Sequence, residues 1–480
     1  MIQFNNVGFT YKDAKDECIK SLNLTINDGE CVLITGKSGC GKTTITRLIN
    51  GLIPKYFDGK LDGNVIIDGV DLMNLPIYKI SEKVGSVFQN PRTQFFNVDT
   101  NSEIAFGMEN QGIQREIMDE TLIKISNELK INDLLKKNIF SLSGGQKQKL
   151  AFASVYAMNP DIYLLDEPSS NLDVNAINIL KNNILLLKKK KKTIIIVEHR
   201  LYYLRNIVDR ILYFDQGKLK KEFTSEEFKN LDKLECKKLG LRNVKLNVES
   251  IIKTNERNMT NSHTLRVRDF FIGYGKKCIL SNININAGRG EIIAIVGNNG
   301  VGKTTFVRTI CGLIHEISGS IYWNNKKLSC KERLNISYMV LQDVNYQLFA
   351  DSVENECVLG IDNPNMKLVE ETLKSLDIYD YKEVHPNILS GGQKQRTAVA
   401  VSILCNKDLL VFDEPSSGLD YDGMNDISNV VKKLSDKGKL IFIVTHDFEL
   451  ISQICSRILY FDKEGIHNEI KEDFFRKSII

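Results

Sequence analysis

The chain contains 480 residues, with 64 basic and 60 acidic side chains and a formal net charge of +4. This length exceeds what a single hydrophobic core supports. The near balance of charge gives no reason to expect a nucleic acid or an anionic surface as a partner. The ten cysteines are scattered without a C-x-x-C pair, which argues against a zinc site and a disulfide framework and suits a reducing cytosol.

The first residues enter a strand pattern directly, and no apolar run approaches the length of about 18 residues that spans a bilayer. We therefore expect neither a signal peptide nor a membrane span, and any membrane role has to come through a partner. Apolar and polar side chains alternate at residues 2–11 and again at 22–27, which predicts two half-buried strands.

The apolar run 31–36, CVLITG, is typical of a central parallel strand that helices cover on both faces. It leads into residues 36–44, GKSGCGKTT, which fit the P-loop pattern G-x-x-x-x-G-K-[ST] between a strand and a helix. Glycines are needed in such a loop because a Cβ atom would keep the backbone away from the phosphates. Lys42 and Thr43 are therefore predicted to hold nucleotide phosphates and one Mg²⁺ position. Cys40, inside the loop, could be a reactive thiol or simply one of its variable positions.

Two further apolar runs end in polar residues: IYLLDE at 162–167 and TIIIVEH at 193–199. If both are parallel strands, Asp166, Glu167 and His199 lie at the carboxyl edge of the sheet, where open α/β folds bind ligands. A helix N-cap is the alternative interpretation of the acidic pair. The P-loop upstream favours the catalytic interpretation.

The string LSGGQ, residues 142–146, opens a helical pattern, and the same five residues return at 389–393. A serine and two glycines at a helix start leave backbone N–H groups pointing outward together with the positive end of the helix dipole, which makes an anion site. Amphipathic patterns at 115–138 and 367–380 precede the two strings. These segments predict helical subdomains that carry LSGGQ.

The second half repeats the first in the same order, with a P-loop at 297–305, LLVFDE at 409–414 and LIFIVTH at 440–446. The offset is 261 at the P-loop lysines (303 minus 42) and 247 at the acidic pairs (413 minus 166). The halves are therefore collinear copies. We expect domains at 1–243 and 263–480, joined by an exposed linker at 244–262 that is rich in Asn, Lys and Thr.

Taken together, these motifs resemble those of a tandem ATP-binding-cassette (ABC) ATPase, with two nucleotide-binding domains fused in one polypeptide. The resemblance implies an α/β fold in which each domain has a mostly parallel sheet core, an antiparallel β subdomain and a helical subdomain carrying LSGGQ. It also implies that ATP and Mg²⁺ bind at two composite sites. In that arrangement the LSGGQ of each half faces the P-loop of the other, head to tail, in an intramolecular pseudo-dimer.

The resemblance assigns nucleotide contacts in both halves to a tyrosine expected to stack on adenine, to the P-loop and to LSGGQ. In the first half these residues are Tyr11, Gly36, Ser38, Gly39, Gly41, Lys42, Thr43, Thr44, Ser143, Gly144, Gly145 and Gln146. In the second half they are Tyr274, Gly297, Asn299, Gly300, Gly302, Lys303, Thr304, Thr305, Ser390, Gly391, Gly392 and Gln393. The resemblance implies that residues 390–393 complete the site of Lys42 and that residues 143–146 complete the site of Lys303.

The catalytic positions implied by the resemblance are also present twice. They are the water-polarising glutamates, the switch histidines and the glutamines that relay the nucleotide state: Glu167, Glu414, His199, His446, Gln89 and Gln342. The metal-binding positions are expected to be Thr43, Gln89, Asp166, Thr304, Gln342 and Asp413. Because both halves keep every motif, two hydrolytic sites are predicted.

Within the family, residues 50–63 and 87–96 resemble the ATPases of energy-coupling-factor importers, which take up vitamins and metal ions. The second copy keeps Gln347 at the position of Gln94 but differs at the two residues after its glutamine. This resemblance implies a peripheral location on the cytoplasmic face of the cell membrane. The implied partners are an integral membrane coupling subunit and a substrate-binding membrane subunit, and no nucleic acid.

Two alternatives share most of these motifs. A sugar-importer type tandem ATPase has every catalytic motif named above. A soluble ribosome-associated tandem ATPase also fits, although such proteins usually join their domains by a long charged helical linker, and residues 244–262 are short and poorly helical.

Overall fold

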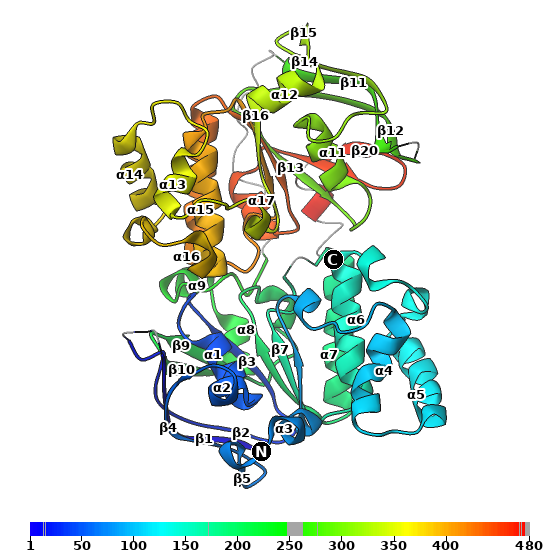
Figure 1. Cartoon of the computed structure of the whole chain (residues 1–480), viewed down its shortest axis with the longest axis vertical. Helices are drawn as coiled ribbons and strands as arrows, with labels where there is room; N and C mark the ends of the chain where they lie inside the picture. The colour runs from blue at the N-terminus through cyan, green and yellow to red at the C-terminus, as the bar shows by residue number, and fades with distance from the viewer. Residues whose placement is uncertain are drawn as a thin grey trace. The chain divides into compact units, whose positions relative to one another are not determined.

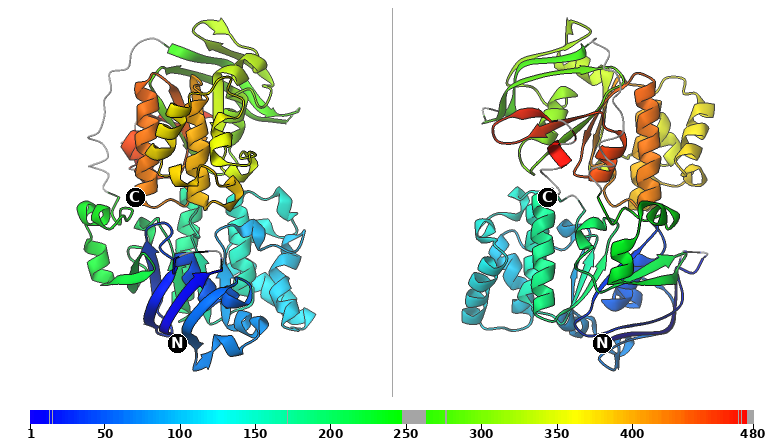
Figure 2. Two further views of the ribbon diagram at one scale, coloured as in Figure 1. Left: turned by 60° about the vertical axis from the view of Figure 1, so that its left-hand side comes forward. Right: turned by 180° about the vertical axis from the view of Figure 1, so that it is seen from behind.

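The computed structural model describes residues 1–246 except 13, 15 and 171, residues 263–469 except 276, and residues 471 and 473–475. Contacts divide the chain into two compact units, Met1–Lys245 and Leu246–Ile480 (Figures 1 and 2). Val244, the first residue of the predicted linker 244–262, is buried in the core of the first unit. The rest of that predicted linker, from residue 247, lies outside the described residues.

The first unit contains two sheets. The smaller sheet is antiparallel and has the order β2-β1-β4-β5, formed by β1 (Ile2–Tyr11), β2 (Ile19–Ile26), β4 (Gly59–Ile67) and β5 (Val70–Asp71). The larger sheet has the order β10-β9-β3-β8-β7-β6 and comprises β3 (Cys31–Gly36), β6 (Val84–Val87), β7 (Ile162–Asp166), β8 (Thr193–Val197), β9 (Arg210–Asp215) and β10 (Lys218–Thr224). All neighbouring strands of the larger sheet are parallel except the β9–β10 edge pair.

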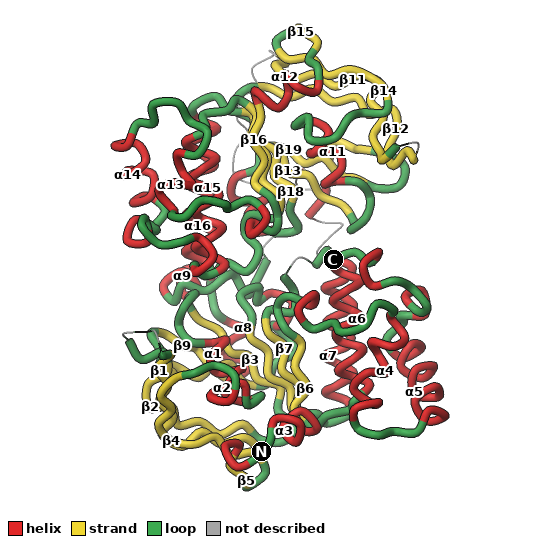
Figure 3. The backbone as a smooth tube through the Cα atoms, in the orientation of Figure 1, coloured by secondary structure: helices red, strands yellow, loops and turns green. Residues whose placement is uncertain are grey.

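Helices cover both faces of the larger sheet of the first unit (Figure 3). The α-helices of the first unit are α1 (Lys42–Ile49), α2 (Leu52–Lys55), α3 (Ile77–Lys83), α4 (Thr100–Asn110), α5 (Arg115–Glu128), α6 (Gly144–Ala157), α7 (Val174–Lys189), α8 (Ser225–Asn230) and α9 (Lys233–Lys238). Alternate residues of β3 point into two different cores, Cys31 and Leu33 into one, Val32 and Ile34 into the other. This double burial explains why the strand is apolar throughout.

One core of the first unit lies between the two sheets and includes α1, whereas the other lies under α6 and α7. Helices α4, α5 and α6 contact one another and form the helical subdomain that carries LSGGQ. The predicted helical segment 115–138 is α-helical only to Glu128, and a short 3-10 helix follows at Asn132–Leu134. The α-helix ends at Glu128 because Lys130 takes a left-handed backbone conformation, with φ of 54°.

The second unit repeats this architecture. Its antiparallel sheet, of order β12-β11-β14-β15, contains β11 (His263–Tyr274), β12 (Lys277–Gly288), β14 (Ser318–Trp323) and β15 (Lys326–Lys327). Its larger sheet, of order β16-β17-β18-β13-β19-β20, contains β13 (Ile292–Gly297), β16 (Ser337–Val340), β17 (Leu409–Asp413), β18 (Leu440–Val444), β19 (Arg457–Phe461) and β20 (Ile466–Glu469). The predicted fold class is confirmed in both units.

The helices of the second unit occupy corresponding places (Figure 1). They are α11 (Lys303–Ile310), α12 (Cys330–Ile336), α13 (Val353–Val358), α14 (Met366–Ser375), α15 (Gly391–Leu404), α16 (Tyr421–Asp436) and α17 (Phe448–Ile454). Helix α14 also stops before a left-handed residue, Asp377. None of the helices that the structure describes is both long enough and apolar enough to cross a bilayer.

Candidate functional site

In each unit, the P-loop connects the central strand of the larger sheet to the helix that follows it. Gly36 ends β3 and Gly41 caps α1, both with positive φ. A Cβ atom on Gly36 would lie 2.0 Å from the carbonyl oxygen of Phe214, so only glycine fits there. Gly297 repeats the constraint, since its Cβ would lie 2.1 Å from the carbonyl oxygen of Phe461.

The P-loop lysine of each unit is buried inside the curve of its own loop. The Nζ of Lys42 donates hydrogen bonds to the carbonyl oxygens of Gly36 at 3.0 Å and Lys37 at 2.8 Å. The Nζ of Lys303 donates to Asn298 O at 3.0 Å. A buried ammonium group at a helix N-terminus provides positive charge where phosphate oxygens would be held.

Each acidic strand end places a buried carboxylate near the first turn of the P-loop helix. In the first unit, Oδ1 of Asp166 has no hydrogen-bond partner among the described residues, and Oδ2 lies 3.5 Å from Thr46 Oγ1. In the second unit, Thr304 Oγ1 donates to Oδ2 of Asp413 at 3.3 Å. Burial raises the pKa of both Asp166 and Asp413 to about 6.

These carboxylates fit a divalent cation. A buried carboxylate oxygen without a partner is costly, and a bound cation would satisfy it. Hydroxyl and carboxylate oxygens are the ligands that Mg²⁺ prefers. The described residues contain no cluster of three or more His, Cys, Asp or Glu side chains with metal-binding geometry. Mg²⁺ bound beside a nucleotide usually has one or two protein ligands and completes its coordination with phosphate oxygens and water.

In the first unit, the structure brings together three of the predicted catalytic side chains. The Nε2 of Gln89 donates to Oε2 of Glu167 at 2.7 Å, and the Nε2 of His199 lies 3.7 Å from Oε1 of Glu167. Glu167 has a φ of 46°, a conformation that is costly for a residue with a side chain. Its backbone N–H is held by the carbonyl oxygen of Val197 at 2.8 Å.

Burial sets the protonation of this group. It raises the pKa of Glu167 to about 8, and the nearby carboxylates of Glu198 and Asp166 act in the same direction. Burial also lowers the pKa of His199, and the positive charges of Lys42 and Arg242 lower it further. The imidazole is therefore neutral at physiological pH. A carboxyl group with a pKa near the working pH can exchange a proton, as a general base must.

The second unit arranges its catalytic positions with different contacts. Thr445 Oγ1 donates to Oε2 of Glu414 at 3.2 Å, and Nε2 of His446 lies 3.8 Å from Oε1 of Glu414. Glu414 shares the left-handed conformation of its counterpart, with φ of 50°. Gln342 is exposed two residues beyond the end of β16.

The two tyrosines expected to stack on adenine lie beside their P-loop helices. The hydroxyl of Tyr11 is 3.1 Å from Thr44 Oγ1 and accepts a hydrogen bond from Arg47 at 2.9 Å. Tyr274 is 53% exposed, and its hydroxyl lies 3.5 Å from Thr305 Oγ1. In each half the hydroxyl contacts the second residue after the P-loop lysine.

LSGGQ forms a capping box at the start of α6 and again at the start of α15. Ser143 Oγ accepts from the backbone N–H of Gln146 at 3.3 Å, and Gln146 Oε1 accepts from the backbone N–H of Ser143 at 3.0 Å. Ser390 and Gln393 repeat both bonds. A Cβ atom on Gly144 would meet no atom within 4 Å, so this helix end faces open space where an anion could approach.

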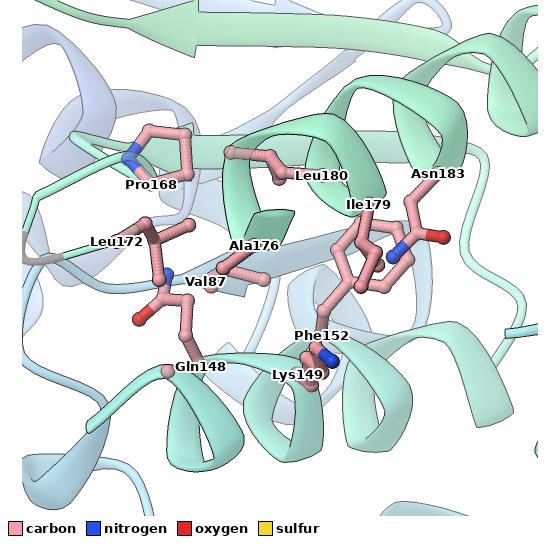
Figure 4. A pocket seen from close by; sticks show the side chains of 11 residues that line it. Val87, Gln148, Lys149, Phe152, Pro168, Leu172, Ala176, Ile179, Leu180 and Asn183 are labelled. Atoms are coloured by element: carbon pink, nitrogen blue, oxygen red, sulfur yellow. The ribbon is translucent and has the colours of Figure 1, made fainter. Parts of the chain in front are cut away.

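A small pocket lies between α6 and α7 of the first unit (Figure 4). Its lining is mainly apolar and comprises Val87, Gly145, Gln148, Lys149, Phe152, Pro168, Leu172, Ala176, Ile179, Leu180 and Asn183. Gly145 belongs to LSGGQ, but no residue of the P-loop lines the pocket. This pocket is therefore separate from the P-loop, where the motifs predict that the nucleotide binds.

Cys40 is 3% exposed, and burial raises the pKa of its thiol against the opposing charge of Lys42. A raised thiol pKa argues against a reactive thiolate at this position. Sequence reasoning missed Glu198, which is 3% exposed and accepts hydrogen bonds from four donors. The only available signal was an acidic residue directly before His199.

The fold and these sites define a nucleotide-binding protein with two P-loop domains. A model of the ABC transporter family matches residues 19–170 and 280–417. Two ABC transporter ATP-binding proteins of Treponema denticola are 46% and 37% identical to the chain, over 98% and 99% of it and 97% of each relative. A Clostridium perfringens relative is 34% identical over 96% of the chain and 88% of the relative.

Among solved structures, the RNase-L Inhibitor matches 96% of this chain and 90% of its own with a TM-score of 0.65. The sequence identity is 22%, so this likeness shows the fold alone. The family match and the identity to its members are decisive. The chain belongs to the ABC transporter family and is an ATP-binding protein with two tandem ABC ATPase domains.

Proposed function

We propose that the chain is the ATP-hydrolysing subunit of an energy-coupling-factor type importer. It would drive uptake of a vitamin or a metal ion through an integral coupling subunit and a substrate-binding membrane subunit, from the cytoplasmic face of the cell membrane. The observation that carries this proposal is a pair of exposed phenylalanines, one in each unit. Both lie on the loop that follows the nucleotide-relay glutamine.

Phe96 and Phe349 are 76% and 74% exposed. The backbone N–H groups of Phe96 and the next residue donate to Oε2 of Glu103 at 3.0 and 2.8 Å. The corresponding groups at Phe349 donate to Oε2 of Glu356, both at 2.7 Å. Each glutamate is 3% exposed. Both units thus use a buried carboxylate to hold an aromatic side chain outward.

A second pair of side chains fixes the other end of each loop. Gln94 Oε1 accepts from the backbone of Phe88 at 3.3 Å, and its Nε2 donates to Ser86 O at 3.1 Å. Gln347 makes the equivalent bonds, accepting at 3.0 Å and donating to the main chain at 2.8 Å. A loop that is already ordered loses little entropy on binding. Exposed aromatic side chains on an ordered loop are typical anchors of a protein interface.

The same loop also connects to the ATP site. Gln89, at its start, is hydrogen-bonded to Glu167 at 2.7 Å, and Phe96 lies seven residues further along the chain. Movement of a partner bound at Phe96 would therefore shift Gln89 and change its hydrogen bond to Glu167. This connection supports a subunit that converts ATP hydrolysis into movement of a membrane partner.

For the ATP sites, we propose the head-to-tail arrangement. Ser390 to Gln393 would complete the site of Lys42, and Ser143 to Gln146 would complete the site of Lys303. The helix N-termini at LSGGQ support this assignment, because each offers an anion site on a helical subdomain. Tyr11 and Tyr274 would stack on adenine.

The proposed chemistry is the same in both sites. Glu167 and Glu414 would accept the proton of the attacking water, while neutral His199 and its counterpart His446 would contact the γ-phosphate. Mg²⁺, when bound, neutralises charge on the phosphates. Its ligands would be Thr43, Gln89 and Asp166 in the first site and Thr304, Gln342 and Asp413 in the second.

The test is copurification from detergent-solubilised membranes, with bound proteins identified by mass spectrometry. We expect a membrane coupling subunit to be recovered with the wild-type chain and lost with the double variant Phe96→Ala, Phe349→Ala. Leu234→Ala is the matched control, because Leu234 is an apolar residue that is 69% exposed on α9 and belongs to neither loop. Ribosomes in place of a membrane subunit would support the ribosome-associated alternative and contradict the proposal.

A further inference from the structure

Each switch histidine has one buried carboxylate beside it, but on opposite sides in the two units. In the first unit, Glu198 precedes His199 and is 3% exposed. In the second unit, Asp447 follows His446 and is 2% exposed. The residue that follows the histidine in the first unit is Arg200, and the residue that precedes the histidine in the second unit is Thr445. A buried carboxylate persists only where its hydrogen bonds compensate for lost hydration.

In the first unit, Glu198 joins two loops. Its Oε2 accepts from the backbone N–H of Ser169 at 3.3 Å and from the hydroxyl of Tyr203 at 3.2 Å. Its Oε1 accepts from the backbone N–H groups of His199 at 3.1 Å and Arg200 at 2.9 Å. The side chain of Arg200 donates to the carbonyl oxygen of Ser169 at 3.5 Å. The histidine loop is therefore fastened to the loop that follows the acidic pair.

In the second unit, the carboxylate that follows the histidine connects the same two loops. Ser416, the counterpart of Ser169 at the offset of 247 (416 minus 169), donates through its hydroxyl to Oδ2 of Asp447 at 2.6 Å. Oδ1 of Asp447 accepts from two backbone N–H groups of α17, at 3.1 and 3.3 Å. The backbone N–H of Asp447 donates to Thr445 Oγ1 at 3.1 Å, and that hydroxyl donates to Glu414.

We propose that Glu198 and Asp447 are positioning residues for ATP hydrolysis, which fasten each histidine loop to the loop after the acidic pair. The pair Glu198 with Arg200 and the pair Thr445 with Asp447 are two interchangeable solutions to one requirement. The inference rests on the proposed roles of Glu167 and His199. It does not depend on the membrane partner or on the transported substrate.

The chemistry of the two pairs predicts how exchanges behave. Glu198→Thr alone removes the carboxylate that accepts from three backbone N–H groups, those of Ser169, His199 and Arg200. Arg200→Asp alone places a second carboxylate beside Glu198, where like charges repel. The two changes together rebuild the arrangement of the second unit, with one hydroxyl and one carboxylate.

The experiment measures steady-state ATP turnover and the KM for ATP in the full-length chain. Each single variant should lower turnover to about half if the sites act independently, and further if they are coupled. Glu198→Thr combined with Asp447→Asn, which disables both units, should lower kcat by about tenfold to a hundredfold, as expected for misplaced catalytic groups, with a smaller change in KM. The double variant Glu198→Thr, Arg200→Asp should recover turnover.

Recovery of turnover in the double variant would show that the single variants act by misplacing catalytic groups. A general loss of stability would instead be at least as large in the double variant, which carries more substitutions. Glu198→Gln keeps the size of the side chain and one acceptor, and its unfolding temperature shows whether the fold is intact. The proposal is overturned if folded Glu198→Gln and Glu198→Thr retain wild-type turnover, or if the double variant is no better than the poorer single variant. Turnover by the variant Glu167→Gln, Glu414→Gln would instead contradict the site roles themselves.

Discussion

Replacing Glu167 by glutamine should stabilise the nucleotide-free protein at alkaline pH. The side chain is 12% exposed and lies near the carboxylates of Glu198 and Asp166. The pKa of Glu167 is about 8 in the folded protein, against an ordinary value of 4.5. The folded state therefore holds a proton that the unfolded chain has released between these pH values. The free energy of unfolding consequently falls as the pH rises from about 4.5 to 8.

The size of the effect follows from the pKa difference. Each unit of pKa corresponds to about 1.4 kcal/mol, so the difference between 4.5 and about 8 means that the ionised Glu167 costs the fold on the order of 5 kcal/mol above pH 8. Glutamine keeps the shape of the side chain and cannot ionise. Glu167→Gln should thus raise the melting temperature of the first unit at pH 8.5 by on the order of 10 °C and change it little at pH 5.

The assay is calorimetric unfolding at pH 5 and pH 8.5, without nucleotide and with EDTA to remove divalent cations. Glu120→Gln is the control, since it changes the same type of charge at an exposed position of α5. A stabilisation by Glu167→Gln that is equal at both pH values would refute the reasoning. So would a loss of stability that grows toward alkaline pH.

Two further predictions concern the proposed sites. The variant Glu167→Gln, Glu414→Gln should bind ATP with near wild-type affinity and lose steady-state hydrolysis; brisk turnover, measured by phosphate release, would show that other groups act as the bases. Ser143→Arg should impair the site of Lys303 and spare that of Lys42, because in the proposed arrangement the LSGGQ of the first unit completes the second site. Labelling with a photoreactive ATP analogue, mapped to each half, would reveal the opposite pattern if that assignment were wrong.

Much of the fold could be predicted because the central strands are apolar over their whole length. Residues 31–36 become β3, buried on both faces, and the P-loop follows where its motif indicates. The acidic pair lies at the end of β7, as the position of Asp166 after a buried run suggested. These signals are local, so a single sequence contains them.

What escaped prediction depends on contacts between distant residues or on backbone conformation. The hydrogen bond from Gln89 to Glu167 joins positions 78 residues apart, so no local sequence pattern predicts it. The end of α5 depends on a left-handed conformation at Lys130, a residue type that usually continues a helix. Glu198 and Asp447 lie on opposite sides of their histidines, so a position-by-position comparison of the two halves does not pair them.

The central claim is that each half completes the ATP site of the other. It is tested most directly by cysteine crosslinking in the presence of ATP, with products mapped by mass spectrometry. We expect Ser143→Cys to crosslink with Asn299→Cys in the P-loop of the second half. A crosslink to Ser38→Cys, the matching position in its own half, with none to Asn299→Cys, would contradict the account.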